Sequence, residues 1–300
     1  FTRSKEDVIA IYCMIAFLLV PVAITMCIEA ITQQNLFSIF GGVPELSTIR
    51  EGKIRAQGPF AHAILAGTVG AANIPIMAGL WQHNRIMAIL GITACISMVI
   101  ACSSTGPVIS SIVAVLSLGM WFYRKNMRIL RWVAVIGYIM LDIVMKVPAY
   151  YIIGRIDFTG GSTGWHRARL IEVAFQRLSE WWLAGTDYTR HWMATGVSWS
   201  LDHTDITNHY IYLGVLGGLP LMILFIVMLV KGFGYIGSIL RQAQPVSIKD
   251  EFLVWSLGAS LFVHAASLIS VSYFDQSFIF LYLNLAAVSS FWAWHNCENE

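Results

Sequence analysis

The chain has 300 residues, of which 57% are hydrophobic and only 12% are charged, and its formal net charge is +2 at pH 7. Soluble domains carry about a quarter charged residues, so this composition excludes an ordinary soluble protein and predicts an integral membrane protein with the lipid bilayer as a partner. The small net charge is uninformative about nucleic acid, and we expect no nucleic-acid partner.

Helices that cross a bilayer need roughly 20 mainly apolar residues. Eight such stretches follow one another, at residues 8–28, 60–81, 86–102, 107–123, 130–147, 206–230, 252–274 and 276–297. The fifth contains Asp142 and, one turn later, Lys146 as a possible partner. We therefore expect an all-α protein in which residues 1–300 form one polytopic membrane domain with about eight transmembrane helices. Because no signal-peptide pattern follows Phe1, we expect further helices upstream.

The basic residues separate into two sets of loops. Short loops between alternate stretches carry Arg3, Lys5, Arg85, Arg124, Lys125, Arg128, Arg131, Lys231, Arg241 and Lys249, which indicates that these loops face the cytoplasm. On the opposite side, two long loops at 29–59 and 148–206 carry Arg50, Lys53, Arg55, Arg155, Arg167, Arg169, Arg177 and Arg190. Long loops cross the membrane whatever their charge, so these arginines do not contradict the orientation.

Arginine is the preferred residue for oxygen anions, because its planar guanidinium binds phosphate and carboxylate with two hydrogen bonds and stays charged. An arginine-rich extracytoplasmic face next to a membrane therefore predicts a site for an anionic lipid headgroup. The alternative is that these arginines are solvated loop charges and headgroup anchors.

Residues 148–206 are too long for a simple connector, and we treat them as an extracytoplasmic loop subdomain. Inside it, one apolar face recurs at helical spacing, through Leu170, Ala174, Leu178 and Trp181. Ser162 or Thr163 is expected to cap this helix, and Gly185 follows its end. Trp181 and Trp182 suit the headgroup zone, so we expect an amphipathic helix at the outer interface. This helix either simply covers the spans or directs Arg167 and Arg169 towards a membrane-embedded substrate.

The loop ends in a group of polar residues before the next apolar stretch. His203, Asp205 and His209 have a loose spacing without a cysteine or a second close carboxylate, so we expect no metal there. His209 stands at the entrance of a span, where a histidine is either an interfacial anchor or a general base. In the second case Asp205 or Asn208 would fix its tautomer.

An ordered series of segments then resembles a known family. RAQGPFAHAILAG at 55–67 is followed by SSTGP between two spans, by GSTGWHRARLIEVAF and WWLAGT in the long loop, and by TNHYIYLGVLGGL at the next span. This series, over about residues 50–225, resembles the O-antigen ligase and O-antigen polymerase family of bacterial membrane glycosyltransferases. The order of the segments and their position on one face carry the resemblance.

The resemblance implies a helical fold of the GT-C type in the bacterial cytoplasmic (inner) membrane. It implies transfer of a glycan from a polyprenyl-diphosphate-linked donor to a sugar hydroxyl of a glycan or glycolipid acceptor, on the extracytoplasmic face, without a metal or another cofactor. Arg55 and Arg167 match the family's diphosphate-binding arginines, and His209 matches its catalytic histidine. Further substrate contacts are expected from residues of the same loops: Arg169, Arg155, His166, Asp205, Asn208 and His62.

Three positions depart from the family pattern. The SSTGP loop lacks an arginine that many relatives carry, Gly218 replaces a common glutamate, and His62 stands where relatives often have asparagine. These differences imply a divergent branch with another glycan or acceptor, or one without activity, and they do not separate ligase from polymerase.

Two other functions remain open from the residues alone. A transporter or flippase for a lipid-linked or anionic solute would keep charges such as Asp142 inside a span and use broken helices. The Gly- and Pro-bearing residues 67–79 are the expected place for such a break. A non-catalytic scaffold for envelope assembly is the third possibility.

Overall fold

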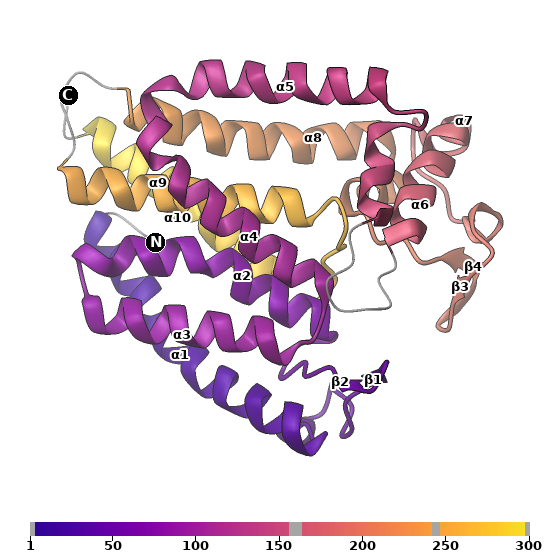
Figure 1. The fold of residues 1–300 in the computed structure, drawn as a ribbon, viewed down its shortest axis with the longest axis horizontal. Helices are drawn as coiled ribbons and strands as arrows, with labels where there is room; N and C mark the ends of the chain where they lie inside the picture. The colour runs from indigo at the N-terminus through magenta and orange to yellow at the C-terminus, as the bar shows by residue number, and fades with distance from the viewer. Residues whose placement is uncertain (1–3, 156–163, 242–246, 298–300) are drawn as a thin grey trace. The chain divides into compact units, whose positions relative to one another are not determined.

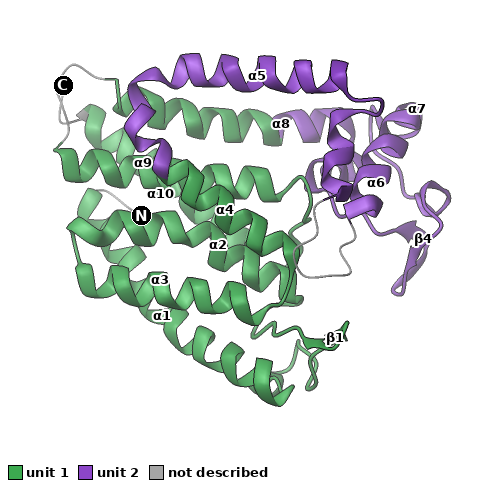
Figure 2. Ribbon diagram, in the orientation of Figure 1, with its two compact units in different colours: residues 1–118, 225–300 green, residues 119–224 purple. Residues whose placement is uncertain are grey.

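The computed structural model describes residues 4–155, 164–241 and 247–297, and most of them are helical (Figure 1). The chain divides into two compact units (Figure 2). Unit 1 contains residues 1–118 and 225–300, and unit 2 contains residues 119–224. The prediction of a mostly helical protein is confirmed, and its long apolar helices are consistent with an all-α membrane protein.

Unit 1 is a helical bundle. Its helices are α1 (Lys5–Thr32), α2 (Ala63–Gly79), α3 (Arg85–Ala101), α4 (Thr105–Gly119), the second part of α8 (His209–Ile239), α9 (Ile248–Ser267) and α10 (Ser277–Cys297). Short 3-10 helices lie at η1 (Leu36–Phe40) and η2 (Leu80–Gln82). Strands β1 (Ile49–Arg50) and β2 (Lys53–Ile54) pair as a small antiparallel hairpin in the loop between α1 and α2.

Helix α2 lies inside unit 1 because its small residues let neighbouring helices approach closely. A Cβ on Gly70 would lie 2.9 Å from the carbonyl oxygen of Cys95 in α3, and one on Gly79 would lie 2.7 Å from Cβ of Ser256 in α9. The helix continues through Pro75 without interruption. The expected break within residues 67–79 is therefore wrong.

Five helical stretches are long and apolar enough to cross a membrane within the described residues: Lys5–Thr32, Ala63–Gln82, Thr105–Val144, His209–Ile239 and Ser277–Asn296. The predicted count of eight is not confirmed. Helix α3 has only 17 residues, α9 begins with the charged Lys249, Asp250 and Glu251, and two predicted spans join in the continuous stretch Thr105–Val144.

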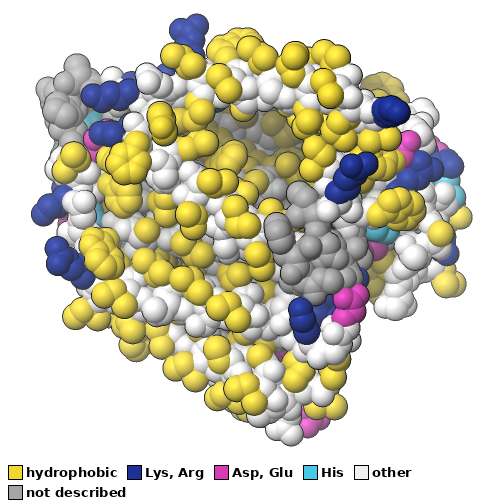
Figure 3. Space-filling view, viewed as in Figure 1, with side chains coloured by type: hydrophobic (Ala, Val, Ile, Leu, Met, Phe, Trp, Pro, Cys, Tyr) yellow, Lys and Arg dark blue, Asp and Glu magenta, His cyan; other side chains and the backbone are white. Residues whose placement is uncertain are grey.

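The outer surface of unit 1 is apolar. Large hydrophobic side chains on α1 are exposed, among them Met14 and Phe17 at 59% and Ile31 at 83%. Hydrophobic side chains cover much of the face drawn over α1, α3 and α4 in Figure 3. Such surfaces are unusual in a monomeric soluble protein and suit contact with lipid chains.

Unit 2 begins with η3 (Met120–Asn126) and α5 (Met127–Val144), followed by η4 (Ala149–Arg155), α6 (Gly164–Gln176) and α7 (Leu178–Trp181). It continues with η5 (Arg190–Trp192), the antiparallel strands β3 (Gly196–Val197) and β4 (Ser200–Thr204), and the first part of α8. Its core consists of Leu170, Ile171, Val173, Ala174, Trp181, Trp192, Met193, Ile211 and Val215. Helix α6, which lies in the long loop, thus packs on the first turns of α8.

The predicted loop helix is present as α6 and α7, which are separated at Arg177. Leu170, Ala174 and Trp181 are buried, as their spacing predicted. The headgroup position expected for Trp181 is wrong, because this side chain is 2% exposed in the core, whereas Trp182 is 50% exposed. Residues 162 and 163, the expected cap, lie outside the described residues.

Candidate functional site

Arg55 lies in unit 1, directly after the β1–β2 hairpin, and is 7% exposed. Its backbone N–H donates to the carbonyl oxygen of Thr48 at 3.0 Å. Its guanidinium Nη2 donates to the hydroxyl of Ser104 at 3.2 Å. Ser104 comes from the SSTGP segment, so the two family-like segments of unit 1 lie together.

The charge of Arg55 is uncompensated among the described residues, since no carboxylate there forms an ion pair with it. Burial lowers the pKa of Arg55 from its usual value. Cys102 opposes this effect, whereas the nearby charge of Arg50 adds to it. A guanidinium nevertheless stays charged at any physiological pH. A buried cation whose side-chain partner is neutral favours binding of an anion.

His62 lies close to this charge and caps α2. Its ring Nδ1 accepts from the backbone N–H of Ile64 at 3.1 Å, which places the proton of the neutral ring on Nε2. Burial, together with the nearby charges of Arg55 and Arg50, lowers the pKa of His62 to about 4 against the opposing effect of Asp275. At neutral pH His62 is therefore an uncharged donor, which suits hydrogen bonding to an anion.

In unit 2, the helix α6 carries Arg167 and Arg169 in different environments. Arg167 is buried at 8% exposure. Arg169 is partly exposed and its Nη1 donates to Glu172 at 2.5 Å, and Tyr151 donates to the same carboxylate oxygen. These two hydrogen bonds lower the pKa of Glu172. The charge of Arg169 is thus compensated within α6, which weakens its predicted role as a substrate contact. Arg155 ends η4 and is exposed.

The entrance of α8 brings together other predicted residues. Asn208 accepts with Oδ1 from the backbone N–H of Ile211 at 3.1 Å and so caps the helix. His209 is fully buried, and its ring stacks on Tyr212 with centroids 5.8 Å apart. The ring Nε2 of His166 lies 3.2 Å from the backbone oxygen of Asp205, which is itself exposed. His166 therefore links the start of α6 to the segment before α8.

Helix α7 and the residues that follow it, up to Thr186 (the α7 segment), bind at a break in α8 that was not predicted from the sequence. Gly217 and Gly218 leave the helical conformation, with φ +69° at Gly218. The N–H of Leu219 donates to the carbonyl of Trp182 at 2.8 Å, and the N–H of Thr186 donates to the carbonyl of Val215 at 2.8 Å. The loop thereby satisfies backbone groups that the break frees. The signal for it was the glycine-rich GVLGGLP.

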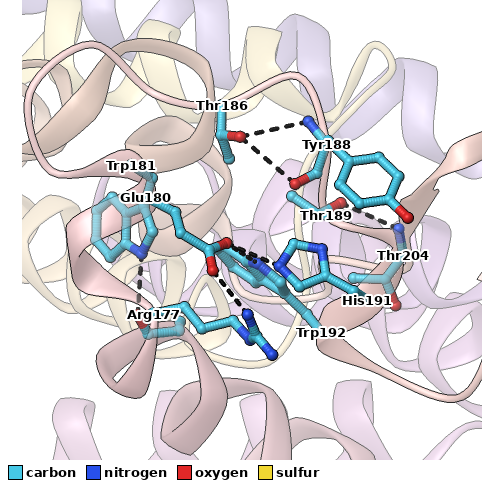
Figure 4. Close-up of polar contacts among 10 residues, drawn as sticks. Arg177, Glu180, Trp181, Thr186, Tyr188, Thr189, His191, Trp192 and Thr204 are labelled. Carbon is cyan, nitrogen blue, oxygen red and sulfur yellow. Dashed lines mark hydrogen bonds and ion pairs between the residues drawn. The ribbon is translucent and has the colours of Figure 1, made fainter.

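The carboxylate of Glu180 in α7 connects α7 to the residues of η5 (Figure 4). Its carboxylate binds Arg177 Nη1 at 2.7 Å, His191 Nε2 at 2.9 Å and the indole N–H of Trp192 at 3.0 Å. Burial alone would raise the pKa of Glu180, but the hydrogen bonds from Trp192, Arg177 and His191 outweigh it and lower the pKa. Arg177 is therefore a structural residue of the loop.

The predicted residues divide between the units. Arg55 and His62 belong to unit 1, whereas Arg155, His166, Arg167, Arg169, Asp205, Asn208 and His209 belong to unit 2. Among the described residues, no three His, Cys, Asp or Glu side chains are arranged to hold a metal ion. No family model and no curated protein matches the chain.

Proposed function

We propose that this protein is a metal-independent membrane glycosyltransferase of the O-antigen ligase or polymerase type. It transfers a glycan from a polyprenyl diphosphate carrier to a sugar hydroxyl at the extracytoplasmic face of a bacterial cytoplasmic membrane. One observation carries the proposal: Arg55 is a buried guanidinium whose side-chain partner is the neutral hydroxyl of Ser104. Its charge suits the diphosphate of such a carrier.

In this reaction the bond between the anomeric carbon and the diphosphate oxygen breaks, and both electrons stay on the oxygen. The charge of Arg55 stabilises the negative charge that develops there, as preorganised positive groups do in other enzymes. Diphosphate is a good leaving group once it is neutralised, so the reaction needs no general acid. The neutral ring of His62 adds a donor to the diphosphate.

The acceptor sugar contributes the incoming oxygen. As the new glycosidic bond forms, the proton of the acceptor hydroxyl passes to the imidazole of His209, which acts as general base. The stacking of His209 on Tyr212 restrains the orientation of the ring. A base that is held in place in this way contributes about 10²–10⁴-fold to the rate.

A transporter or flippase remains the second candidate because of the break in α8. Discontinuous spanning helices are common at the binding sites of transporters. However, the backbone groups near Gly218 are hydrogen-bonded by the α7 segment. Asp142, the charge inside a predicted span, accepts from the N–H of Ala149 at 2.8 Å rather than pairing with Lys146.

The test is an assay in proteoliposomes with a polyprenyl-diphosphate-linked glycan and an oligosaccharide acceptor, followed by mass analysis. We expect a covalent glycan product with wild-type protein and none with Arg55→Ala, whereas Arg177→Ala retains activity. Movement of the lipid-linked glycan across the bilayer without any covalent product would overturn the proposal and favour the flippase.

A further inference from the structure

Glu29 is a buried carboxylate in the last turns of α1, where it is 1% exposed. Its Oε1 accepts from the hydroxyl of Ser47 at 2.5 Å and from the N–H of Gln57 at 2.9 Å. Its Oε2 accepts from the N–H of Gly58 at 2.8 Å. One side chain at the end of α1 therefore holds the following loop at two separate points.

The second of these points, at Gln57 and Gly58, follows Arg55 closely in the sequence. Four consecutive N–H groups, those of residues 55–58, each donate to an acceptor outside the segment. The first two donate to the carbonyls of Thr48 and Ala101, at 3.0 and 3.2 Å, and the last two donate to Glu29. On the other side of the segment, Asn35 donates from Nδ2 to the carbonyl of Gly58 at 2.8 Å. The backbone that carries Arg55 is thus held firmly, and Glu29 supplies half of its amide acceptors.

We propose that Glu29 is a positioning residue, which fixes the backbone of residues 55–58 so that the Arg55 guanidinium is preorganised for a diphosphate anion. The inference rests on the proposed function, because that function assigns the anion to Arg55. Preorganised groups bind a developing charge more effectively than mobile ones, since they need no reorganisation.

The chemistry requires a carboxylate at this position. Three donors meet Glu29, and they are divided over both of its oxygens. Glutamine has one acceptor oxygen and an NH2 group, which would oppose a backbone N–H donor on one side. A buried donor that loses its acceptor is costly, so the segment would shift.

Glu29 also leaves the charge of Arg55 available. Within the part of the chain that the structure describes, Glu29 accepts only from neutral donors and forms no ion pair with Arg55. It therefore orders the arginine segment without neutralising the guanidinium. Arg169 shows the opposite arrangement, because Glu172 pairs with it directly.

The first experiment measures hydrogen–deuterium exchange in purified Glu29→Gln protein, with Glu45→Gln as the control. Glu45 is an exposed carboxylate of the same loop, so the control removes the same charge. We expect exchange of residues 55–58 to be faster by about tenfold in Glu29→Gln, because hydrogen bonds to a charged acceptor are lost there. Exchange of residues 55–58 should be unchanged in Glu45→Gln. Exchange in α3 and α10 should be unchanged in both variants. Unchanged exchange at residues 55–58 in Glu29→Gln would overturn the proposal.

The second experiment measures affinity for inorganic pyrophosphate in a double-mutant cycle of Glu29→Gln and Arg55→Ala. Glu29→Gln alone should weaken binding by about tenfold or more, and it should have no further effect once Arg55 is replaced. A purely structural role would instead give the same loss in both backgrounds, which would overturn the inference. Should Glu29→Gln fail to fold, Ser47→Ala provides a second variant, because it removes one donor to Glu29. Ser47→Ala should weaken pyrophosphate binding about twofold to threefold when Arg55 is present and should have no effect in the Arg55→Ala background. The same loss in both backgrounds would overturn the inference.

The two proposals fail separately in these measurements. Wild-type protein that binds pyrophosphate through Arg55 and Glu29 but forms no glycan product would contradict only the glycosyltransferase. Wild-type protein that forms product while Glu29→Gln retains full affinity would contradict only the positioning role. Wild-type protein that binds no pyrophosphate would overturn the role of Glu29 outright.

Discussion

The guanidinium of Arg55 donates to the hydroxyl of Ser104 at 3.2 Å across 49 positions of the sequence. Ser104 directly precedes α4, so the loop after α1 is tied to the start of another helix of unit 1. The bond holds the arginine in place without cancelling its charge.

Arg55→Lys should lower kcat/KM for the diphosphate-linked donor by about tenfold to a hundredfold, because lysine offers a point charge in place of a planar fork. The measurement is initial rate against donor concentration in detergent or proteoliposomes. Arg177→Lys provides the control, since Arg177 binds Glu180 and should tolerate the exchange. An unchanged kcat/KM in Arg55→Lys would argue against bidentate binding of the diphosphate.

His209→Ala should lower kcat by about 10²–10⁴-fold and leave binding of the donor nearly unchanged, because a general base acts on the acceptor. Single-turnover rates and donor affinity, measured separately, check this. His203→Ala is the matched control, because His203 pairs with Ser200 on the β3–β4 hairpin. Full transfer by the His209 variant would remove the assignment of the base.

His62 should make unit 1 less stable in mild acid. Burial, together with Arg55 and Arg50, lowers the pKa of His62 to about 4 in the folded protein, against about 6.5 in an unfolded chain. Between these values only the unfolded chain takes up the proton, so its contribution to stability is fully present above about pH 6.5 and is lost as the pH falls towards 4.

Asparagine at position 62 caps a helix well and does not titrate. His62→Asn should therefore reduce the loss of stability between pH 7 and pH 4.5 by about 1–2 kcal/mol. Thermal unfolding in detergent at the two pH values measures the effect. Equal pH dependence in the variant and the wild type would show that His62 is not the responsible group.

Gly218→Ala should destabilise unit 2 by about 2 kcal/mol or more, because Gly218 has φ +69° and a Cβ would lie 2.3 Å from the carbonyl oxygen of Leu183. Gly234→Ala in the same helix meets nothing within 4 Å and should be neutral or stabilising by up to about 1 kcal/mol. Thermal unfolding and proteolysis near residue 183 compare the two variants. A Gly218→Ala variant that is as stable as the wild type would contradict the non-helical backbone at this position of α8.

The sequence predicted the helices well because long apolar runs and a helical stripe are local patterns. The stripe through Leu170 and Ala174 located α6, and both residues are buried in the core of unit 2. The count of spans was harder, since α4 and α5 are joined through 3-10 turns and α9 starts with charged residues. Hydropathy alone does not distinguish two short helices from one long stretch.

The features of the site that sequence analysis missed depend on contacts between distant residues. Glu29 is a lone acidic residue near the end of an apolar run, and only the fold shows that it binds Gln57 and Gly58. Likewise, the partner of Arg169 is one turn away at Glu172 and could have been predicted from helical spacing. The partner of Arg55, Ser104, could not.

The most direct measurement of the central claim is native mass spectrometry of the purified protein with polyprenyl diphosphate and, separately, polyprenyl monophosphate. We predict that wild-type protein retains the diphosphate lipid in preference to the monophosphate, and that Arg55→Ala loses this preference while it still binds ordinary phospholipid. Equal retention of both lipids by the wild type, or an unchanged preference in Arg55→Ala, would contradict a diphosphate site at Arg55.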